Sequence, residues 1–229
     1  WTTFPHPSYP MLDQLVDRIH VAARKDPSKA PTLVFLEKGV HRLTRNEAYV
    51  CVHRSLTFVG EDREETVVMG GFNCNRDREK DHKVRLETMT VTSKWGHGVT
   101  GDLKNEHLCA TFEGREVTFD NCMFSGLDTT DAEVSLTNCS VKNCGFSGIV
   151  AWRSGVIHLR GERTEVTGNC GNGEESTFGL RAAEPSSKII LHAPLTLASV
   201  SHGNTDDDYG GRGKIYQEDE VVYDGPDDY

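Results

Sequence analysis

The chain of 229 residues lacks several features that would have assigned it to a common class. No run approaches 18 apolar residues, so the sequence predicts no helix that spans a membrane. There is no Cys-X-X-Cys pair, and the seven cysteines do not have the spacing of a zinc ribbon or a disulfide framework. There is also no basic stripe, and the net charge is −10. A dominant role in nucleic-acid binding is therefore disfavoured, because nothing would neutralise the phosphates.

The negative charge is concentrated near the C-terminal end of the chain. From Asn204 to Tyr229, nine Asp and Glu residues stand against Arg212 and Lys214, which gives this stretch a net charge of −7. The other 203 residues carry only −3. We therefore expect residues 217–229 to form an acidic tail, in which Pro226 and the surrounding Asp residues are disordered or dock on a partner.

Three consecutive carboxylates, Asp206, Asp207 and Asp208, are a weak candidate for binding Ca²⁺. Calcium prefers several oxygen ligands, but these residues lack a glycine-spaced loop with a closing glutamate. No group of Cys and His supplies the four ligands that zinc requires. The sequence therefore predicts no metal centre and no other cofactor.

The cysteines are expected to be buried thiols, because several of them follow an asparagine at a recurrent position. Buried thiols favour a reducing, intracellular compartment. The chain begins with Trp1 rather than Met, which is also compatible with a signal peptide that has been removed. The sequence therefore leaves the compartment open.

One seven-residue phrase occurs twice in the chain. Asn121 begins Asn-Cys-Met-Phe-Ser-Gly-Leu, and Asn143 begins Asn-Cys-Gly-Phe-Ser-Gly-Ile. When related stretches are aligned on the glycine of the phrase, the steps between copies are 28, 22 and 31 residues. The aliphatic residues that follow this glycine are Val99, Leu127, Ile149 and Leu180. Internal periodicity in this range indicates stacked repeats.

Each repeat predicts three short strands separated by bends, because short runs alternate apolar and polar residues. For one repeat the strands are expected near Gly148–Trp152, Val156–Leu159 and Thr164–Val166. Such repeats would stack into parallel sheets with rungs about 4.8 Å apart.

Asn and Gly occur between the runs, and both tolerate a left-handed backbone. We expect Gly114, Asn138 and Gly161 to occupy stacked turns with positive φ. The shared phrase also predicts that Cys122 and Cys144 are buried, unpaired and stacked on one another.

The segment before the repeats predicts a helix. Its apolar residues fall on one helical face: Met11, Leu12, Leu15, Val16, Ile19, Ala22 and Ala23. We expect a helix over Tyr9–Lys25 that covers the open end of the stack. The predicted organisation is an N-terminal segment with this helix over residues 1–30, the repeat region over 31–216 and the tail over 217–229.

The stretch from Pro31 to Ile215 resembles the parallel β-helix repeats of the pectin-lyase-like superfamily. It is similar to sugar-hydrolase-associated β-helix modules and to the β-helix regions attached to some F-box proteins. The resemblance implies an all-β solenoid, a right-handed parallel β-helix with three short strands per coil and an N-terminal capping α-helix. It is weak for function, because the superfamily includes lyases, hydrolases, esterases, epimerases and non-catalytic modules.

The enzymes of that superfamily usually work on the outward face of one sheet. If the aliphatic residues after each glycine point inward, their neighbours point outward and form a surface that we call the ladder face. Its predicted members are His97, Thr100, Asp102, Asp128, Trp152 and Arg181, with Arg153 and Glu184 at the margin. A tryptophan beside charged groups suits a sugar ring and its hydroxyl or carboxylate groups.

Two functions remain open. The first is a non-catalytic binding or scaffold module that presents the ladder face to a polysaccharide or protein partner. Its ligand contacts would be His97, Thr100, Trp152, Arg153 and Glu184. This function is favoured, because no catalytic constellation of the superfamily is present residue by residue.

The alternative is a polysaccharide-active enzyme that uses the same face. A glycoside hydrolase would use Asp102 and Asp128 as its two carboxylates, and a lyase would use Arg181 as its base. Gly96-His97-Gly98 and Asn204-Thr205-Asp206 also occur in polygalacturonases, but in the reverse order, and we treat both matches as chance.

Overall fold

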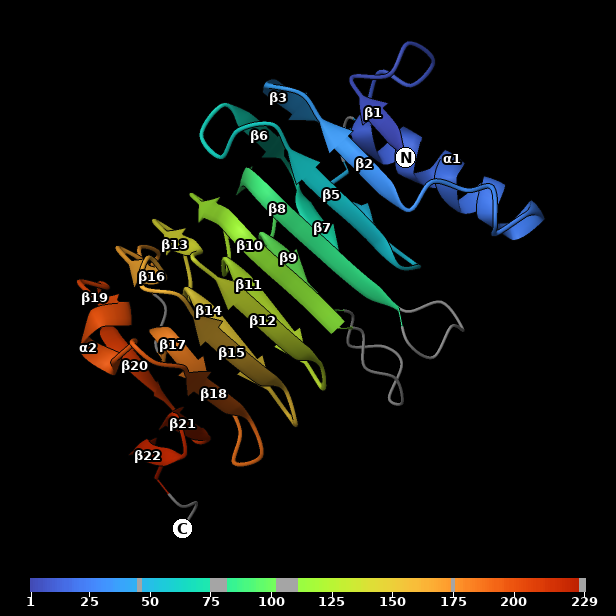
Figure 1. Cartoon of the computed structure of the whole chain (residues 1–229). Helices are drawn as coiled ribbons and strands as arrows, with labels where there is room; N and C mark the ends of the chain where they lie inside the picture. Colours follow the sequence, from blue (N-terminus) through green and yellow to red (C-terminus); the bar gives the residue numbers. More distant parts are fainter. Residues whose placement is uncertain (45–46, 75–81, 102–110, 174–175, 227–229) are drawn as a thin grey trace.

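The computed structural model describes residues 1–44, 47–74, 82–101, 111–173 and 176–226. Strands make up 48% of the described residues and helices 9%, so the all-β prediction is confirmed at the level of fold class. The strands form two long sheets in which neighbours pair in parallel, except for one antiparallel pair at the C-terminal end. Figure 1 shows the strands side by side along one axis, with the two termini at opposite ends.

The larger sheet has 15 strands, and its main path contains ten of them. In order they are β1 (Thr2–Phe4), β2 (Leu33–Leu36), β5 (Leu56–Gly60), β8 (Lys83–Thr92), β10 (Thr111–Asp120), β12 (Glu133–Thr137), β15 (Val156–Arg160), β18 (Lys188–Leu191), β21 (Lys214–Gln217) and β22 (Glu220–Asp224). Two branches join this path. One joins at β8 and consists of β6 (Thr66–Met69) and β3 (Gly39–Arg42), and the other joins at β10 and consists of β13 (Ser140–Lys142), β16 (Glu165–Thr167) and β19 (Ser201–His202).

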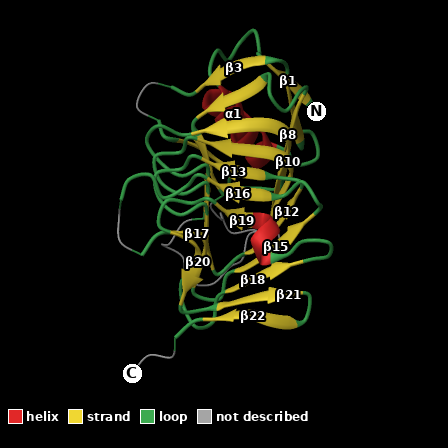
Figure 2. Ribbon diagram, turned by 90° about the vertical axis from the view of Figure 1, so that its left-hand side faces the viewer, coloured by secondary structure: helices red, strands yellow, loops and turns green. Residues whose placement is uncertain are grey.

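The smaller sheet has seven strands. In spatial order they are β20 (Asp207–Gly211), β17 (Phe178–Ala182), β14 (Ile149–Trp152), β11 (Leu127–Thr130), β9 (Val99–Thr100), β7 (Gly71–Asn73) and β4 (Tyr49–Cys51). The chain therefore passes repeatedly between the two sheets, and Figure 2 shows the resulting stack from the side. The strands predicted for one repeat correspond to β14, β15 and β16, each within two residues of its expected ends.

The interior is built from aliphatic side chains that stack in register. Val99 pairs with Leu127, Leu127 with Ile149, and Ile149 with Leu180. All four are buried, which confirms that they point inward. Complete burial of one such side chain stabilises a fold by about 1.5–3 kcal/mol, so the repeated rungs supply a large part of the core energy.

One predicted turn is displaced by two residues. Asn138 and Gly161 have φ of 53° and 79°, as expected, but the stacked residue of the preceding strand is Glu116, with φ of 54°. Gly114 instead lies inside β10 and pairs with Leu136. A β-carbon at Gly114 would lie 2.8 Å from the Leu136 side chain, so the glycine meets a packing constraint and not a turn constraint.

A second corner explains the repeated phrase. Asn121 and Asn143 have φ of 54° and 55°, and Gly168 and Gly203 follow them in register with φ of 65° each. A left-handed residue is needed at the same place in four successive layers, and only Asn and Gly adopt that conformation readily.

The residues after this corner point into the interior. Cys122 and Cys144 are 1% and 0% exposed and form no disulfide, and a hydrogen bond joins their side chains. In the next layer Asn169 occupies the position that corresponds to Cys144, and its side chain is completely buried. Its side chain accepts from the Cys144 amide at 3.0 Å and donates to the Val141 carbonyl at 3.0 Å, so the buried amide is satisfied.

Helix α1 (Leu12–Lys25) confirms the predicted helix, but it begins three residues later than expected. Tyr9 pairs with His6 in a β-bridge and Met11 has an extended backbone, which delays the helix start. Leu12, Leu15 and Ile19 are buried, and α1 packs against β4 at the end of the smaller sheet. Among the described residues, no helix is both long enough and apolar enough to cross a membrane.

Part of the predicted tail is ordered. Residues Glu220–Asp224 form β22, which pairs antiparallel with β21, and the Lys214 ammonium lies 2.9 Å from the Asp224 carboxylate. Residues 227–229 are outside the described part of the chain. A short helix, α2 (Leu197–Val200), is capped at its N-terminus by Thr196, whose side chain accepts from the Ser199 amide.

The turn at Asn138 is open to a direct test. Asn138→Val should lower the free energy of unfolding by about 2 kcal/mol, because a β-branched residue is strained at positive φ. Asn138→Gly should cost about 1 kcal/mol or less, because it keeps the turn and loses only the weak 3.4 Å hydrogen bond from the Arg163 amide. Urea titrations of the two variants give the comparison, and equal losses would contradict the assigned turn.

The cysteine stack predicts thiols that do not react in the folded chain. The hydrogen bond with Cys122 and burial raise the pKa of Cys144 well above its ordinary value, and burial raises the pKa of Cys139 to about 11. Cys122 and Cys144 should therefore resist a thiol reagent until the chain is unfolded with urea. Mass spectrometry of peptides labelled before and after unfolding measures this, and rapid native labelling of either residue would refute it.

Candidate functional site

The ladder face lies on the outward side of β9, β11, β14 and β17. Thr100 pairs with Asp128, Asp128 with Val150, and Val150 with Arg181, so these positions form one row across four strands. Trp152 pairs with Thr130 in the next row. The constant offset from the inward aliphatic residues places these side chains on one side of the sheet, although Val150 within the row is itself buried, and Asp102 lies outside the described residues.

Asp128, Trp152 and Arg181 form a compact polar cluster on this face. The Trp152 indole N–H donates to Asp128 Oδ2 at 3.2 Å. The Arg181 guanidinium carbon lies 4.9 Å from the centre of the Trp152 ring, which is a cation–π distance. The indole is therefore half-buried, with its N–H bonded and one face against a cation, and is less open than the sequence suggested.

Burial changes the ionisation of this cluster. It raises the pKa of Asp128, and the charges of His97 and Arg181 and the Trp152 hydrogen bond oppose that rise. Burial also lowers the pKa of Arg181, against the attraction of Asp128. The two charges stabilise each other across a surface from which much of the water is excluded.

His97 lies at the edge of the same cluster. Burial lowers the pKa of His97, and the Asp128 charge opposes this effect. Its Nδ1 accepts from the Ser125 amide at 3.3 Å, which places any proton of a neutral ring on Nε2. The His97 amide donates to the Tyr49 hydroxyl at 3.1 Å, and the ring packs on Phe124 at 5.3 Å.

The two marginal residues are less closely tied to the cluster. Arg153 occupies a bend with φ of 51° after β14, and its guanidinium lies 3.5 Å from the Asp131 carboxylate. Glu184 lies in the turn after β17, where its backbone bonds with Ser187. Among the described residues, no hydrogen bond or ion pair joins either side chain to Trp152 or Arg181.

Several polar atoms of the face are buried without a hydrogen-bond partner among the described residues. They are Thr130 Oγ1, Arg181 Nε and, one strand beyond Thr100, Asn73 Oδ1. A cavity of about 20 Å³ lies beside Thr100 and Asp128. This cavity has room for about one water molecule and not for a sugar ring, so a ligand would lie across the surface.

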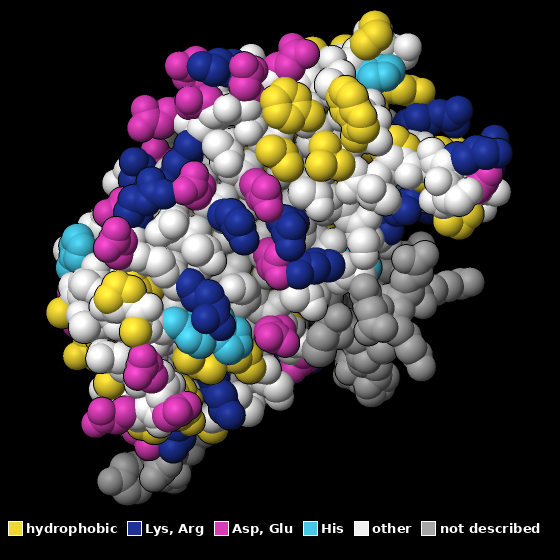
Figure 3. Space-filling view, in the orientation of Figure 1, with side chains coloured by type: hydrophobic (Ala, Val, Ile, Leu, Met, Phe, Trp, Pro, Cys, Tyr) yellow, Lys and Arg dark blue, Asp and Glu magenta, His cyan; other side chains and the backbone are white. Residues whose placement is uncertain are grey.

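The outward face of the larger sheet carries a different set of side chains. Figure 3 shows basic and acidic groups mixed across it; one example is the Arg85–Glu113 pair at 2.6 Å. Further along, His158 Nδ1 and His192 Nε2 are 2.9 Å apart. The described residues contain no group of three or more metal-ligating side chains.

The three aspartates considered for calcium take part in local hydrogen bonds. Asp206 Oδ2 accepts from the Thr177 hydroxyl at 2.5 Å, and Asp208 Oδ1 accepts from the Asn204 amide at 3.1 Å. Asp207 begins β20 and is exposed. Two of the three carboxylates thus already bind the protein itself, and calcium binding stays an untested prediction.

Trp95 is not among the site residues that the sequence predicts. This side chain is 74% exposed, and in the aligned repeats its position is held by Met123 and Gly145. Met123 is itself 45% exposed, so the position faces solvent in successive layers. The aligned residues alone, Trp95, Met123 and Gly145, do not indicate this exposure, which only the structure shows.

The cluster predicts a particular pH dependence for Asp128→Asn. Because the pKa of Asp128 is raised above its ordinary 3.8, the ionised carboxylate costs stability at neutral pH. That cost disappears as the pH falls through the raised pKa toward 3.8, since the folded chain then binds a proton more readily than the unfolded chain. The variant should gain stability over the parent at pH 7, and urea titrations should show this gain shrinking toward pH 4. A constant difference across that range would contradict the assignment.

Comparison with known proteins assigns this chain to no family. No family model, no curated protein and no solved structure matches it. The resemblance to the pectin-lyase-like superfamily therefore stays a prediction from the repeat, and the candidate site is supported by its own geometry.

Proposed function

We propose that the chain is a non-catalytic binding module, a right-handed parallel β-helix whose ladder face is presented to a glycan or protein partner. The observation that carries the proposal is the cluster in which Trp152 is held between the Asp128 carboxylate and the Arg181 guanidinium. A rigid aromatic ring with one hydrogen-bond acceptor and one cation beside it matches the mixed surface of a sugar.

The β-helix part of the proposal is supported by the strand pairing. Successive parallel strands of both sheets pair in register, and the same inward residue type returns in each layer. Parallel strands joined by crossovers are right-handed in almost all known cases, which favours that hand here. A stack of this kind also offers a rigid, repeating outer surface.

The ladder face is suited to binding because its groups are already positioned. Asp128, Trp152 and Arg181 project from strands and not from loops, so little conformational entropy is lost when a ligand binds to them. Arg181 is partly desolvated, and its side chain is still partly exposed at the surface. A ligand hydroxyl or carboxylate oxygen would satisfy a guanidinium of this kind.

A polysaccharide-active enzyme is the second candidate, and the raised pKa of Asp128 favours it. A carboxyl group whose pKa is raised by burial can act as a general acid. In a hydrolase Asp102 would be the second carboxylate, and in a lyase Arg181 would be the base. The binding proposal is preferred because, within the described residues, Asp128 is the cluster's single carboxylate.

A glycan-array screen with matched variants tests the binding proposal. Trp152→Ala should weaken binding by about 1–3 kcal/mol, or roughly 5- to 150-fold, because the ring contact is lost. Trp152→Phe keeps an aromatic ring and should retain more affinity. Trp1→Ala removes another exposed tryptophan, 82% exposed, and should have no effect. A folded Trp152→Ala protein with unchanged binding would place the function elsewhere.

The enzyme candidate predicts a different outcome. If the chain cleaves a polysaccharide, new reducing ends or unsaturated sugars should appear on incubation with the parent protein. Asp128→Asn should then abolish this product and leave binding nearly unchanged, because the lost charge acts mainly on the transition state. Absence of product with the parent protein, together with retained glycan binding, supports the non-catalytic module.

A further inference from the structure

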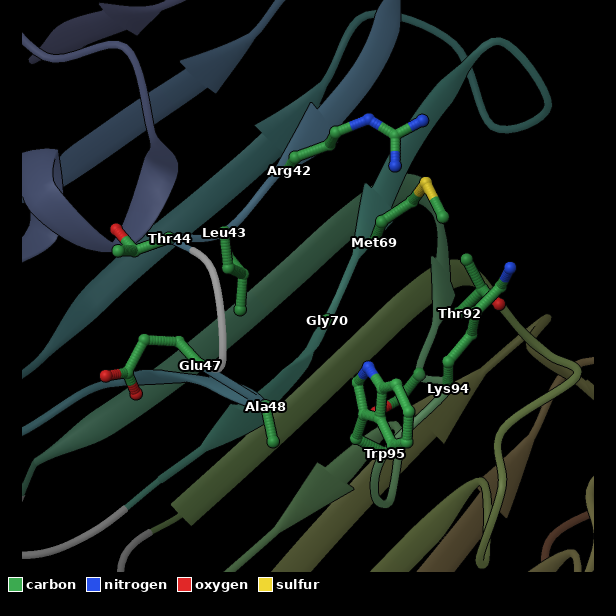
Figure 4. Close-up of a pocket in the computed structure, with 11 residues that line it drawn as sticks. Arg42, Leu43, Thr44, Glu47, Ala48, Met69, Gly70, Thr92, Lys94 and Trp95 are labelled. Atoms are coloured by element: carbon green, nitrogen blue, oxygen red, sulfur yellow. The ribbon is translucent and has the colours of Figure 1, made fainter.

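A groove of about 730 Å³ lies at the corner where β3, β6 and β8 end. We call it the Trp95 groove; its lining includes Arg42, Leu43, Met69, Thr92, Lys94 and Trp95. It shares no residue with the ladder face. Figure 4 shows Arg42 and Trp95 at opposite ends of the groove, with Lys94 near Trp95 and Glu47 on the other side of Gly70.

One wall of the groove is built by strand register. Arg42 pairs with Met69, and Met69 pairs with Thr92, so three successive strands place these side chains in one row. The floor contains Leu43 and Gly70. A β-carbon at Gly70 would lie 2.3 Å from the Leu43 side chain, so the glycine is required by the packing of the floor.

Trp95 is held in an exposed position by its turn. The next residue, Gly96, contacts the Tyr49 hydroxyl so closely that a β-carbon there would lie 2.1 Å from it. That hydroxyl also accepts the His97 amide at 3.1 Å. The indole is nevertheless 74% exposed, so a fixed turn presents a large apolar ring to solvent. Such a ring is an available stacking surface for a ligand.

The cations of the groove are not compensated by neighbouring carboxylates. Arg42 and Lys94 are exposed, and neither forms an ion pair with any residue that the structure describes. Beneath them, the Ser93 hydroxyl is buried and has no hydrogen-bond partner in the described part of the chain.

We propose that the Trp95 groove binds a sugar ring that carries one negatively charged group. The ring would stack on Trp95, its carboxylate, sulfate or phosphate would bind Lys94 beside that ring, and a hydroxyl at the far side of the sugar would bind Arg42 at the other end of the groove. Glu47 and Thr92 also line the groove and can accept hydrogen bonds from the ring hydroxyls. The negative charge of Glu47 would also repel a ligand that carries several negative charges. The site is independent of the ladder face, so either can bind when the other does not.

Isothermal titration calorimetry with small probes tests this proposal. Glucuronate, glucose 6-sulfate and glucose 6-phosphate distinguish the three acidic groups, glucose supplies the ring alone, and inorganic phosphate supplies the anion alone. At least one acidic sugar should bind at least tenfold more tightly than both glucose and inorganic phosphate. Higher salt should weaken that binding, because the cations are exposed.

Variants locate the binding in the groove. Trp95→Ala, Arg42→Gln and Lys94→Gln should each weaken the best acidic sugar at least fivefold. Trp95 and both cations are exposed, so the fold should persist, and circular dichroism checks this. Lys188→Gln removes an exposed cation from β18, four strands along the larger sheet from β8, and should have no effect. Trp152→Phe and Asp128→Asn should also leave this binding unchanged, which separates the groove from the ladder face.

Three results would overturn the proposal. Equal binding of inorganic phosphate and the acidic sugars would show a cation patch without a ring site. No binding of any acidic sugar at 10 mM would show that the groove takes no such ligand. Loss of binding in Trp152→Phe but not in Trp95→Ala would assign the acidic sugar to the ladder face.

Discussion

Each inward aliphatic side chain of the smaller sheet lies on its counterpart in the next strand, because the parallel strands pair without a shift in register. A slip of one residue would turn Leu127 outward and Asp128 into the core. The hydrogen bonds between neighbouring strands and the apolar contacts in the interior of the stack therefore favour the same alignment. The positions of the corners, the ladder face and the Trp95 groove all follow from that alignment.

The corners show how one backbone requirement selects different residues along a column. The left-handed corner is filled by Asn121 and Asn143 and then by Gly168. The position after it changes from Cys144 to Asn169, yet both side chains are buried. A thiol fills this space with little polarity, whereas the buried amide requires the hydrogen bonds that neighbouring layers supply. A single column can thus be apolar in one layer and polar in the next.

The two candidate surfaces differ in how their charges are balanced. On the ladder face, Asp128 and Arg181 are partly buried, and each opposes the effect of burial on the other's ionisation. In the Trp95 groove, Arg42 and Lys94 are exposed and have no acidic partner among the described residues. The charges of the first surface already interact with each other and with Trp152, while the second surface offers its cations and its aromatic ring to a ligand.

The sequence by itself determined the strands, the inward residues and the helix α1, because periods of two and of 3.6 residues are local properties of the chain. It also placed Asp128, Trp152 and Arg181 on one face, since their offsets from Leu127, Ile149 and Leu180 are constant. Only the tertiary structure decided why residue 114 is a glycine. Close packing against Leu136 and a left-handed turn both require glycine, so the sequence alone cannot distinguish the two causes. It also decided that Trp152 is partly covered and Trp95 open, since exposure depends on side chains from other layers that no local pattern specifies.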